Sequence, residues 1–219
     1  MQGPIMSLSL SSNRSRVARF VVSWLLLAGV ANAAELKREF VRHAPEVLRL
    51  CRERGYRNVG ILKFRIRKGE GQQSDNVGPL NLNLADQLEL ALIMANDVRQ
   101  PLGLIHDASA VAVKIPGGNH LTPEGRAALF TGRYPLAWGD QQVTPDAFIV
   151  GVVQMSPDRQ TMTVGLATFA PGKEGLEKLV QFDATPGVDD LIEAGESFVV
   201  RGLFDGGQVD IAEAARKEI

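Results

Sequence analysis

The sequence predicts a single α/β domain with a mixed sheet, in which helices pack mainly on one face. Three observations indicate this class: helical and strand patterns alternate along the chain, one strand pattern is apolar on both faces, and turns rich in proline and glycine lie between them. Of the 219 residues, 45% are hydrophobic and 22% are charged, which is typical of a globular protein. The sequence contains no internal repeat and no low-complexity segment.

The segment 1–33 has the pattern of a secretory signal peptide. Arg14, Arg16 and Arg19 form a positive region, and the apolar stretch FVVSWLLLAGV follows it. Ala31-Asn32-Ala33 has the small-x-small form of a cleavage site, so we expect cleavage between Ala33 and Ala34. An uncleaved anchor is the alternative, but this stretch falls short of the roughly 20 residues that span a bilayer. We therefore expect a periplasmic or secreted protein with no transmembrane span after cleavage.

The whole chain has 24 basic and 25 acidic side chains and a net charge of −1. Cleavage would remove three arginines and no acidic residue, so the mature chain is expected to be more acidic still. This balance argues against nucleic-acid binding, which needs a basic surface. We divide the chain into a signal peptide at 1–33, an N-terminal helical segment at 34–58, an α/β domain at 59–204 and a C-terminal tail at 205–219, which is expected to be helical.

The segment from Glu35 to Arg54 has a helical pattern with its apolar residues on one side. Pro45 is expected to begin a second helical piece, because proline fits the first turn of a helix and interrupts its interior. Cys51 is the only cysteine, so no intramolecular disulfide can form. Since Cys51 lies on the apolar side of the helix, we expect a buried residue rather than a reactive thiol.

The segment NVGILKFRIRKG alternates apolar and basic residues, which predicts a strand with one apolar and one basic face. A strand covered on both faces would be apolar throughout, so the basic face is expected to be open to solvent or to contact another molecule, such as an acidic protein surface or an anionic polymer. A solvated face that only keeps the sheet soluble is the alternative. The candidate interaction residues are Lys63, Arg65, Arg67 and Lys68, with Tyr134 and Trp138 as the next candidates.

A helix is predicted to begin at Pro79, because leucines recur on one side at helical spacing. Leu84, Leu88 and Leu92 are expected to pack against the apolar side of the preceding strand. The apolar residues of that strand are Leu62, Phe64 and Ile66.

The rest of the chain shows further strand and helix signals. Asp107 and Thr122 stand where N-terminal helix caps are expected, and Thr122 is followed by Pro123 and Glu124. The other predicted elements are strands at 102–106, 146–155, 161–169, 179–182 and 198–201, a tight turn at 156–159 and a short acidic helix after residue 187.

The sequence contains no complete catalytic, metal or cofactor motif. Around Gly69-Glu70-Gly71, no glycine precedes a Lys-Ser/Thr pair, Ser74 replaces the third glycine of a dinucleotide fingerprint, and the next helix begins only at Pro79. We therefore interpret this segment as a mobile polar loop without a nucleotide. The three histidines lack paired metal spacing, and no G-x-S-x-G motif is present. No cofactor, metal or catalytic residue is predicted.

Three segments in order carry a family resemblance: NVGILKF, LNLADQLELALIMA and DAFIVGVVQMSPDRQTMTVGLATF. The pattern over residues 59–182 resembles the bacterial envelope superfamily that contains the N-terminal domain of TolB, CsgG, LpoB and FlgO. The resemblance implies an anticodon-binding-domain-like fold in the periplasm, acting through protein–protein contact. It transfers no catalytic residue. The chain departs from several members in having valine at position 30, where a lipoprotein signal needs cysteine, and it lacks the long hairpins of a CsgG-like pore.

Two functions remain open at this point. The first is an exported, periplasmic protein–protein interaction module of an envelope assembly or transport machine, with envelope proteins as partners and no enzymatic activity. The second is a secreted enzyme that acts on cell-wall material through carboxylates not paired in the sequence. A deep pocket with convergent acids would favour the enzyme, and a flat or grooved surface would favour the module.

Overall fold

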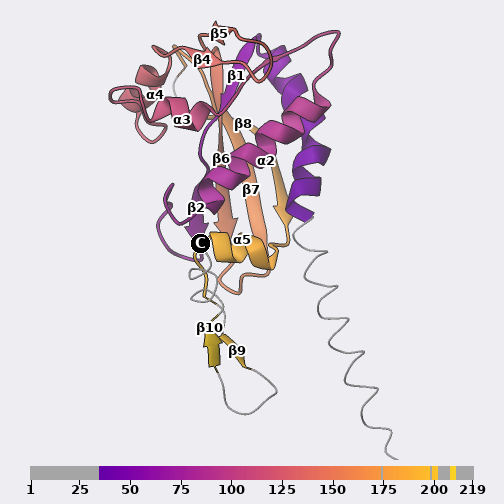
Figure 1. Ribbon diagram of the computed structural model, residues 1–219, viewed down its shortest axis with the longest axis vertical. Helices are drawn as coiled ribbons and strands as arrows, with labels where there is room; N and C mark the ends of the chain where they lie inside the picture. The colour runs from indigo at the N-terminus through magenta and orange to yellow at the C-terminus, as the bar shows by residue number, and fades with distance from the viewer. Residues whose placement is uncertain (1–34, 174, 198, 202–207, 211–219) are drawn as a thin grey trace, which may run out of the picture.

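The computed structural model describes residues 35–173, 175–197, 199–201 and 208–210 (Figure 1). Its centre is a mixed sheet, so the predicted single α/β domain with a mixed sheet is confirmed. The middle strand β6 (Ala147–Met155) is apolar on both sides over most of its length. On one side of β6 lie β1 (Asn58–Ile61), β2 (Arg65–Lys68) and β3 (Gly103–Ile105), all in parallel pairings. On the other side β7 (Met162–Phe169) and β8 (Glu177–Ala184) are antiparallel.

The longer helices lie on one face of the sheet. α2 (Leu80–Ala95) crosses that face in Figure 1, beside the N-terminal helix of residues 35–53 and the short α5 (Val188–Glu193). Phe40 of the N-terminal helix makes edge contacts with Phe64 and Phe182, at ring-centroid distances of 5.9 and 5.7 Å. The N-terminal helical segment therefore shares its core with the α/β domain.

The N-terminal helix is continuous through Pro45, so the expected second helical piece is wrong. Pro45 lies on the exposed side of the helix, where water can bind the carbonyl that loses its intrahelical partner. Cys51 is buried on the opposite side, as expected, and burial raises the pKa of its thiol to about 12. A thiol held so far from ionisation is a poor nucleophile.

Two short helices cover one end of the opposite face. α3 (Ala108–Ala112) and α4 (Pro123–Leu129) begin at the predicted caps: the Asp107 carboxylate accepts a hydrogen bond from the Ala110 amide, and the Thr122 hydroxyl accepts one from the Gly125 amide. These helices enclose a second, smaller apolar cluster. Its larger members are Leu62, Ile105, Leu129, Tyr134, Phe148, Val150 and Phe169.

The predicted strand from residue 59 to 67 is interrupted, and this overturns one packing prediction. Ile61 pairs with Ile149 and Arg65 pairs with Val152, so the first strand has one residue more than β6 over the same stretch. An extra residue reverses which side the following side chains face. Leu62 therefore lies in the second cluster and not beneath α2. Phe64, Ile66, Leu84, Leu88 and Leu92 share the main core, as predicted.

The chain ends bear on three further predictions. β9 (Val199–Arg201) and β10 (Gln208–Asp210) pair antiparallel, so the predicted helical tail is wrong at 208–210. The signal peptide at 1–33, its cleavage between Ala33 and Ala34, and residues 211–219 lie outside the described residues. Within the described part of the chain, no helix is both long and apolar enough to cross a membrane.

Candidate functional site

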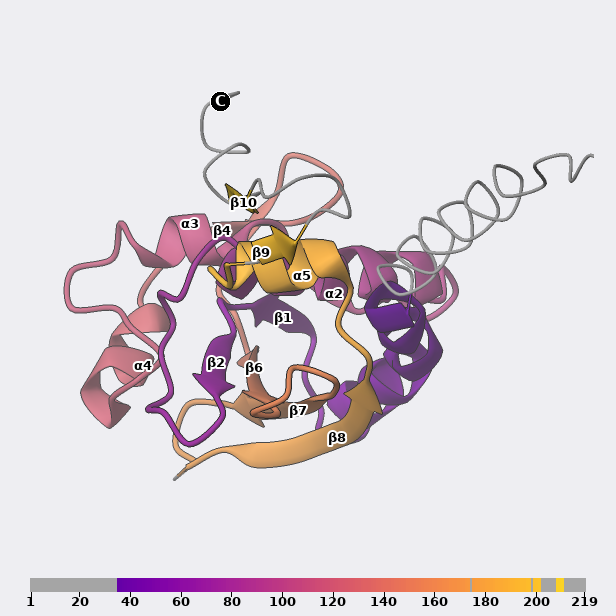
Figure 2. The same cartoon turned by 90° about the horizontal axis from the view of Figure 1, so that it is seen from below.

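One face of the sheet is open and polar at the end away from α3 and α4 (Figure 1). Figure 2 shows no described helix over β8 on the side that faces away from α2, and α4 covers only the Phe169 end of β7. Arg65 and Arg67 lie at the β2 side of this face, and the strand pairing aligns Arg67 with Gln154, Thr163 and Asp183. The Thr163 hydroxyl donates to Asp183 at 2.6 Å. Along this row of the open face, β2 contributes a basic residue and β8 an acidic one.

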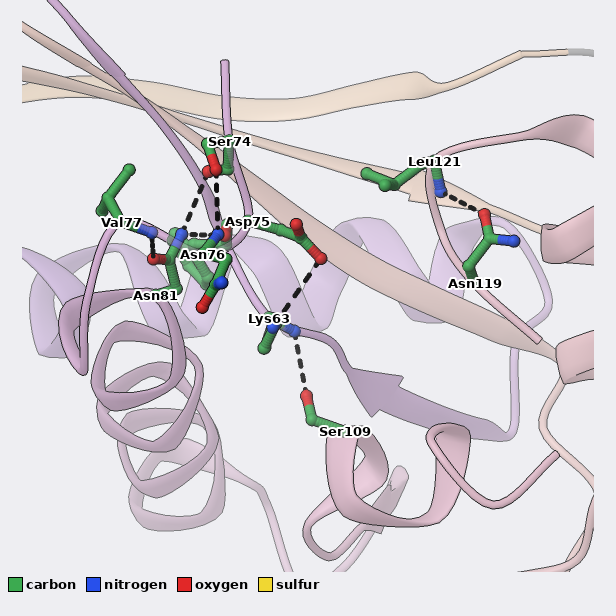
Figure 3. Close-up of polar contacts among 10 residues, drawn as sticks. Lys63, Ser74, Asp75, Asn76, Val77, Asn81, Ser109, Asn119 and Leu121 are labelled. Atoms are coloured by element: carbon green, nitrogen blue, oxygen red, sulfur yellow. Dashed lines mark hydrogen bonds and ion pairs between the residues drawn. The ribbon is translucent and has the colours of Figure 1, made fainter. Parts of the chain in front are cut away.

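The four predicted basic residues do not form one cluster. Figure 3 shows that Lys63 turns toward Asp75, with its Nζ 3.7 Å from the carboxylate, while its backbone amide donates to Ser109. Lys68 forms an ion pair with Glu196 at 3.1 Å. The structure brings only Arg65 and Arg67 together on the open face.

The loop at 69–78 is fastened to the sheet edge, which differs from the mobile loop expected from the sequence. Ser74 exchanges two backbone hydrogen bonds with Ile66, at 2.8 and 2.9 Å. The buried Asn81 amide nitrogen donates to the carbonyls of Phe64 and Ser74, and its oxygen accepts from the Val77 amide (Figure 3). One buried side chain thus connects α2, β2 and the loop. Sequence reasoning placed no role on Asn81, although a polar residue beside core leucines was a visible signal.

Tyr134 does not lie at the surface. Its side chain has no exposed area, its hydroxyl donates to the Leu129 carbonyl at 2.9 Å, and burial raises its pKa to about 12. Tyr134 is a core residue of the second cluster and cannot contact a partner in the folded protein.

Trp138, in contrast, is 42% exposed on the loop that joins β4 (Tyr134–Pro135) to β5 (Gln142–Val143). The hairpin is held against β3, because the Ala137 amide donates to the Leu104 carbonyl at 2.8 Å and the His106 amide donates to the Pro135 carbonyl at 2.9 Å. These contacts place Trp138 beside the C-terminal end of α2.

A groove runs between α2 and this hairpin. It consists of two hollows of about 460 and about 350 Å³, which meet at Ile93. We call this surface the α2 groove and define it by the residues Leu82, Asp86, Leu90, Ile93, Val98 and Trp138.

The exposed side of α2 and the turn after it is unusually apolar. Leu90 is 58% exposed, Met94 is 69% exposed and Val98 is 90% exposed. A helix that packs on a sheet by one side normally has polar residues on the other. Leu84, Leu88 and Leu92 form a first apolar row, which lies in the core. Leu90 and Met94 form a second apolar row, which stays at the surface. Sequence reasoning used only the first row, although the second was visible in LNLADQLELALIMA.

The end of the α2 groove beside α3 is lined by acidic side chains. Glu89 is 7% exposed, and its two oxygens contact His106 Nδ1 at 2.8 Å and the Asp107 amide at 3.1 Å. Burial, followed by the charges of Glu89 and Asp107, raises the pKa of Asp86. Both Glu89 oxygens hold the junction of β3 and α3.

Two histidines are expected to affect stability in opposite directions with pH. The Glu89 hydrogen bond raises the pKa of His106, so His106 stabilises the fold below about pH 6.5, and this contribution is lost as the pH rises through the folded-state value. Burial lowers the pKa of His120, so folding favours the neutral imidazole, and His120 destabilises the fold as the pH falls below about 6.5.

Urea unfolding between about pH 5 and about pH 9 checks this prediction. The stability difference between wild type and His106→Gln should shrink as the pH rises. His120→Gln should instead lose less stability than wild type on acidification. Parallel pH profiles for all three proteins would contradict both assignments.

Within the described residues, no group of three or more His, Cys, Asp or Glu side chains is arranged to hold a metal ion. No protein family matches the chain, and no curated protein matches it. Among solved structures, the C-terminal domain of LpoB from Salmonella enterica aligns with 64% of this chain and 92% of its own, with a TM-score of 0.40 and 8% sequence identity. A likeness at this level carries no argument about family, partner or binding site.

Proposed function

We propose that this protein is an exported, non-catalytic binding module of the bacterial envelope, which docks a partner protein in the α2 groove. The observation that carries the proposal is the second apolar row of α2, exposed beside Trp138. Exposed apolar surface rimmed by polar residues marks interaction sites in soluble proteins. The signal-peptide pattern of segment 1–33 supports an envelope location.

Energetics favour the α2 groove over the basic sheet face as the source of affinity. Fully burying a leucine or methionine side chain contributes about 1.5–3 kcal/mol, whereas an exposed ion pair contributes about 0–1 kcal/mol. Leu90 and Met94 retain more than half of their accessible area for a partner to cover. Arg67 already donates a hydrogen bond from Nε to the Gly71 carbonyl at 2.9 Å, so fewer of its N–H groups remain for a partner.

Photo-crosslinking in intact cells tests the proposal. A photoreactive amino acid placed at Leu90 should give a discrete adduct with an envelope protein. The matched control is Val41, which is 48% exposed on the N-terminal helix and lies outside the groove. Placed there, the same group should give no such adduct.

Variants then identify the contact surface. In a protein with the photoreactive group at Met94, Leu90→Asp should abolish the adduct, and the double variant Arg65→Glu/Arg67→Glu should keep it. Equal adducts from Leu90 and Val41 would contradict the proposed site. Loss of the adduct only in the arginine variant would move the contact to the open sheet face.

A further inference from the structure

The α2 groove is chemically different at its two ends. Asp86 and Asp107 line the end beside α3, together with the buried Glu89 and with His106. The other end is mainly apolar, with Ile93, Val98, Pro101 and Trp138 beside the polar residues Asn96 and Asp97. A bound molecule that fits both ends must therefore have one charged end and one apolar end.

No lysine or arginine is among the described residues that line the acidic end, and its one basic group is His106. Asp86 is exposed and Asp107 caps α3, and none of the described lysines or arginines forms an ion pair with either carboxylate. His106 is engaged by Glu89. The carboxylates are thus free to pair with a positive group that arrives from outside.

Arg52 lies beside the apolar end, where its guanidinium is already hydrogen-bonded. Arg52 donates to the Asn96 side chain at 2.9 Å and to the Gln100 carbonyl at 3.1 Å. Asp97 accepts a hydrogen bond from the Arg99 amide. A charged ligand group is therefore recognised mainly at the α3 end, and apolar ligand groups mainly at the end beside Trp138.

We propose that the α2 groove binds a short amphipathic helix of the partner protein, with lysine or arginine at the Asp86–Asp107 end and apolar side chains over Leu90, Ile93 and Trp138. This inference rests on the proposed function and specifies the chemistry of its partner. α2 is roughly 24 Å long at 1.5 Å per residue, so about four turns of a helix can lie along it. Helix-in-groove recognition uses apolar anchors at this spacing, and complementary charge selects the partner and its orientation.

Two designed, fluorescein-labelled peptides of about 14 residues test the proposal with the full chain as expressed and processed. Both carry leucine at helical spacing; one has lysine and the other glutamate at the remaining positions. Fluorescence anisotropy should show that the leucine–lysine peptide binds at least about tenfold more tightly, and that its advantage shrinks as the salt concentration rises.

Matched variants locate the effect. Asp86→Asn/Asp107→Asn should weaken the leucine–lysine peptide about tenfold, and it should not weaken the leucine–glutamate peptide, whose repulsion by the two carboxylates is relieved. Asparagine keeps the cap and tolerates the left-handed backbone at residue 107, where φ is 47°. Asp183→Asn, on the open sheet face, removes a distant acid and should change neither affinity. Leu90→Asp should weaken the leucine–glutamate peptide further and remove most leucine–lysine binding.

Absence of binding, equal affinities for the two peptides, or an equal effect of Asp183→Asn would overturn the inference. The proposed function fails separately, through the crosslinking experiment. An adduct at Leu90 with a partner segment that lacks basic residues would keep the binding module and exclude this partner chemistry.

Discussion

Replacement of Asn81 by leucine is expected to lower the free energy of unfolding by at least about 1–3 kcal/mol, the cost of one buried polar group left unsatisfied, and the part-buried Val77 amide adds to this loss. Leucine is similar in size to asparagine, but it leaves the Phe64 carbonyl and the Val77 amide without the partner that Asn81 supplies. The Ser74 carbonyl loses one hydrogen bond but keeps the one that it accepts from the Ile66 amide.

Urea unfolding of Asn81→Leu and of Asn83→Leu measures this effect. Asn83 lies on the same helix and is partly exposed, and its side chain makes no hydrogen bond with the described residues, so its replacement should change stability by less than about 0.5 kcal/mol. Hydrogen exchange at 69–78 should also accelerate in Asn81→Leu, since the loop loses its anchor on α2. Similar values for the two variants would show that Asn81 does not hold the loop.

Leu88→Ala is expected to destabilise the fold by about 2–5 kcal/mol, because Leu88 is 1% exposed in the main core and its truncation leaves a cavity. Leu90→Ala, two residues along the same helix, should cost less than about 0.5 kcal/mol. The pair separates the two apolar rows of α2: the first stabilises the fold, and the second is available for contact.

Two quantities are measured for each variant: the free energy of unfolding and the affinity for the leucine–lysine peptide. Leu90→Ala should weaken binding of the leucine–lysine peptide without loss of stability. A destabilisation of Leu90→Ala comparable to that of Leu88→Ala would mean that the second row belongs to the core, and the proposed binding surface would then be wrong.

Local patterns in the sequence were sufficient for much of the fold. The helix beginning at Pro79, the caps at Asp107 and Thr122, and the pair of strands around the turn at 156–159 all appear where they were predicted. Each depends on neighbours within a few residues, through helical spacing, a capping side chain or a turn sequence. Such interactions are encoded in adjacent residues, so they can be identified without knowing what packs on them.

The candidate site depended on contacts between distant segments. Trp138 was one candidate among several until the pairing of its hairpin with β3 placed it beside α2, and Tyr134 proved to be buried. The four predicted basic residues were separated by ion pairs with Asp75 and Glu196, which lie in other segments.

The sequence by itself determined the α/β class, the main helix and strand patterns and the apolar row that forms the core. The tertiary structure alone decided that one extra residue before Arg65 turns Leu62 to the opposite face, and that the second row of α2 borders a groove with an acidic end. The physical reason is that periodicity specifies which residues share a side, whereas strand register and long-range packing decide what that side meets.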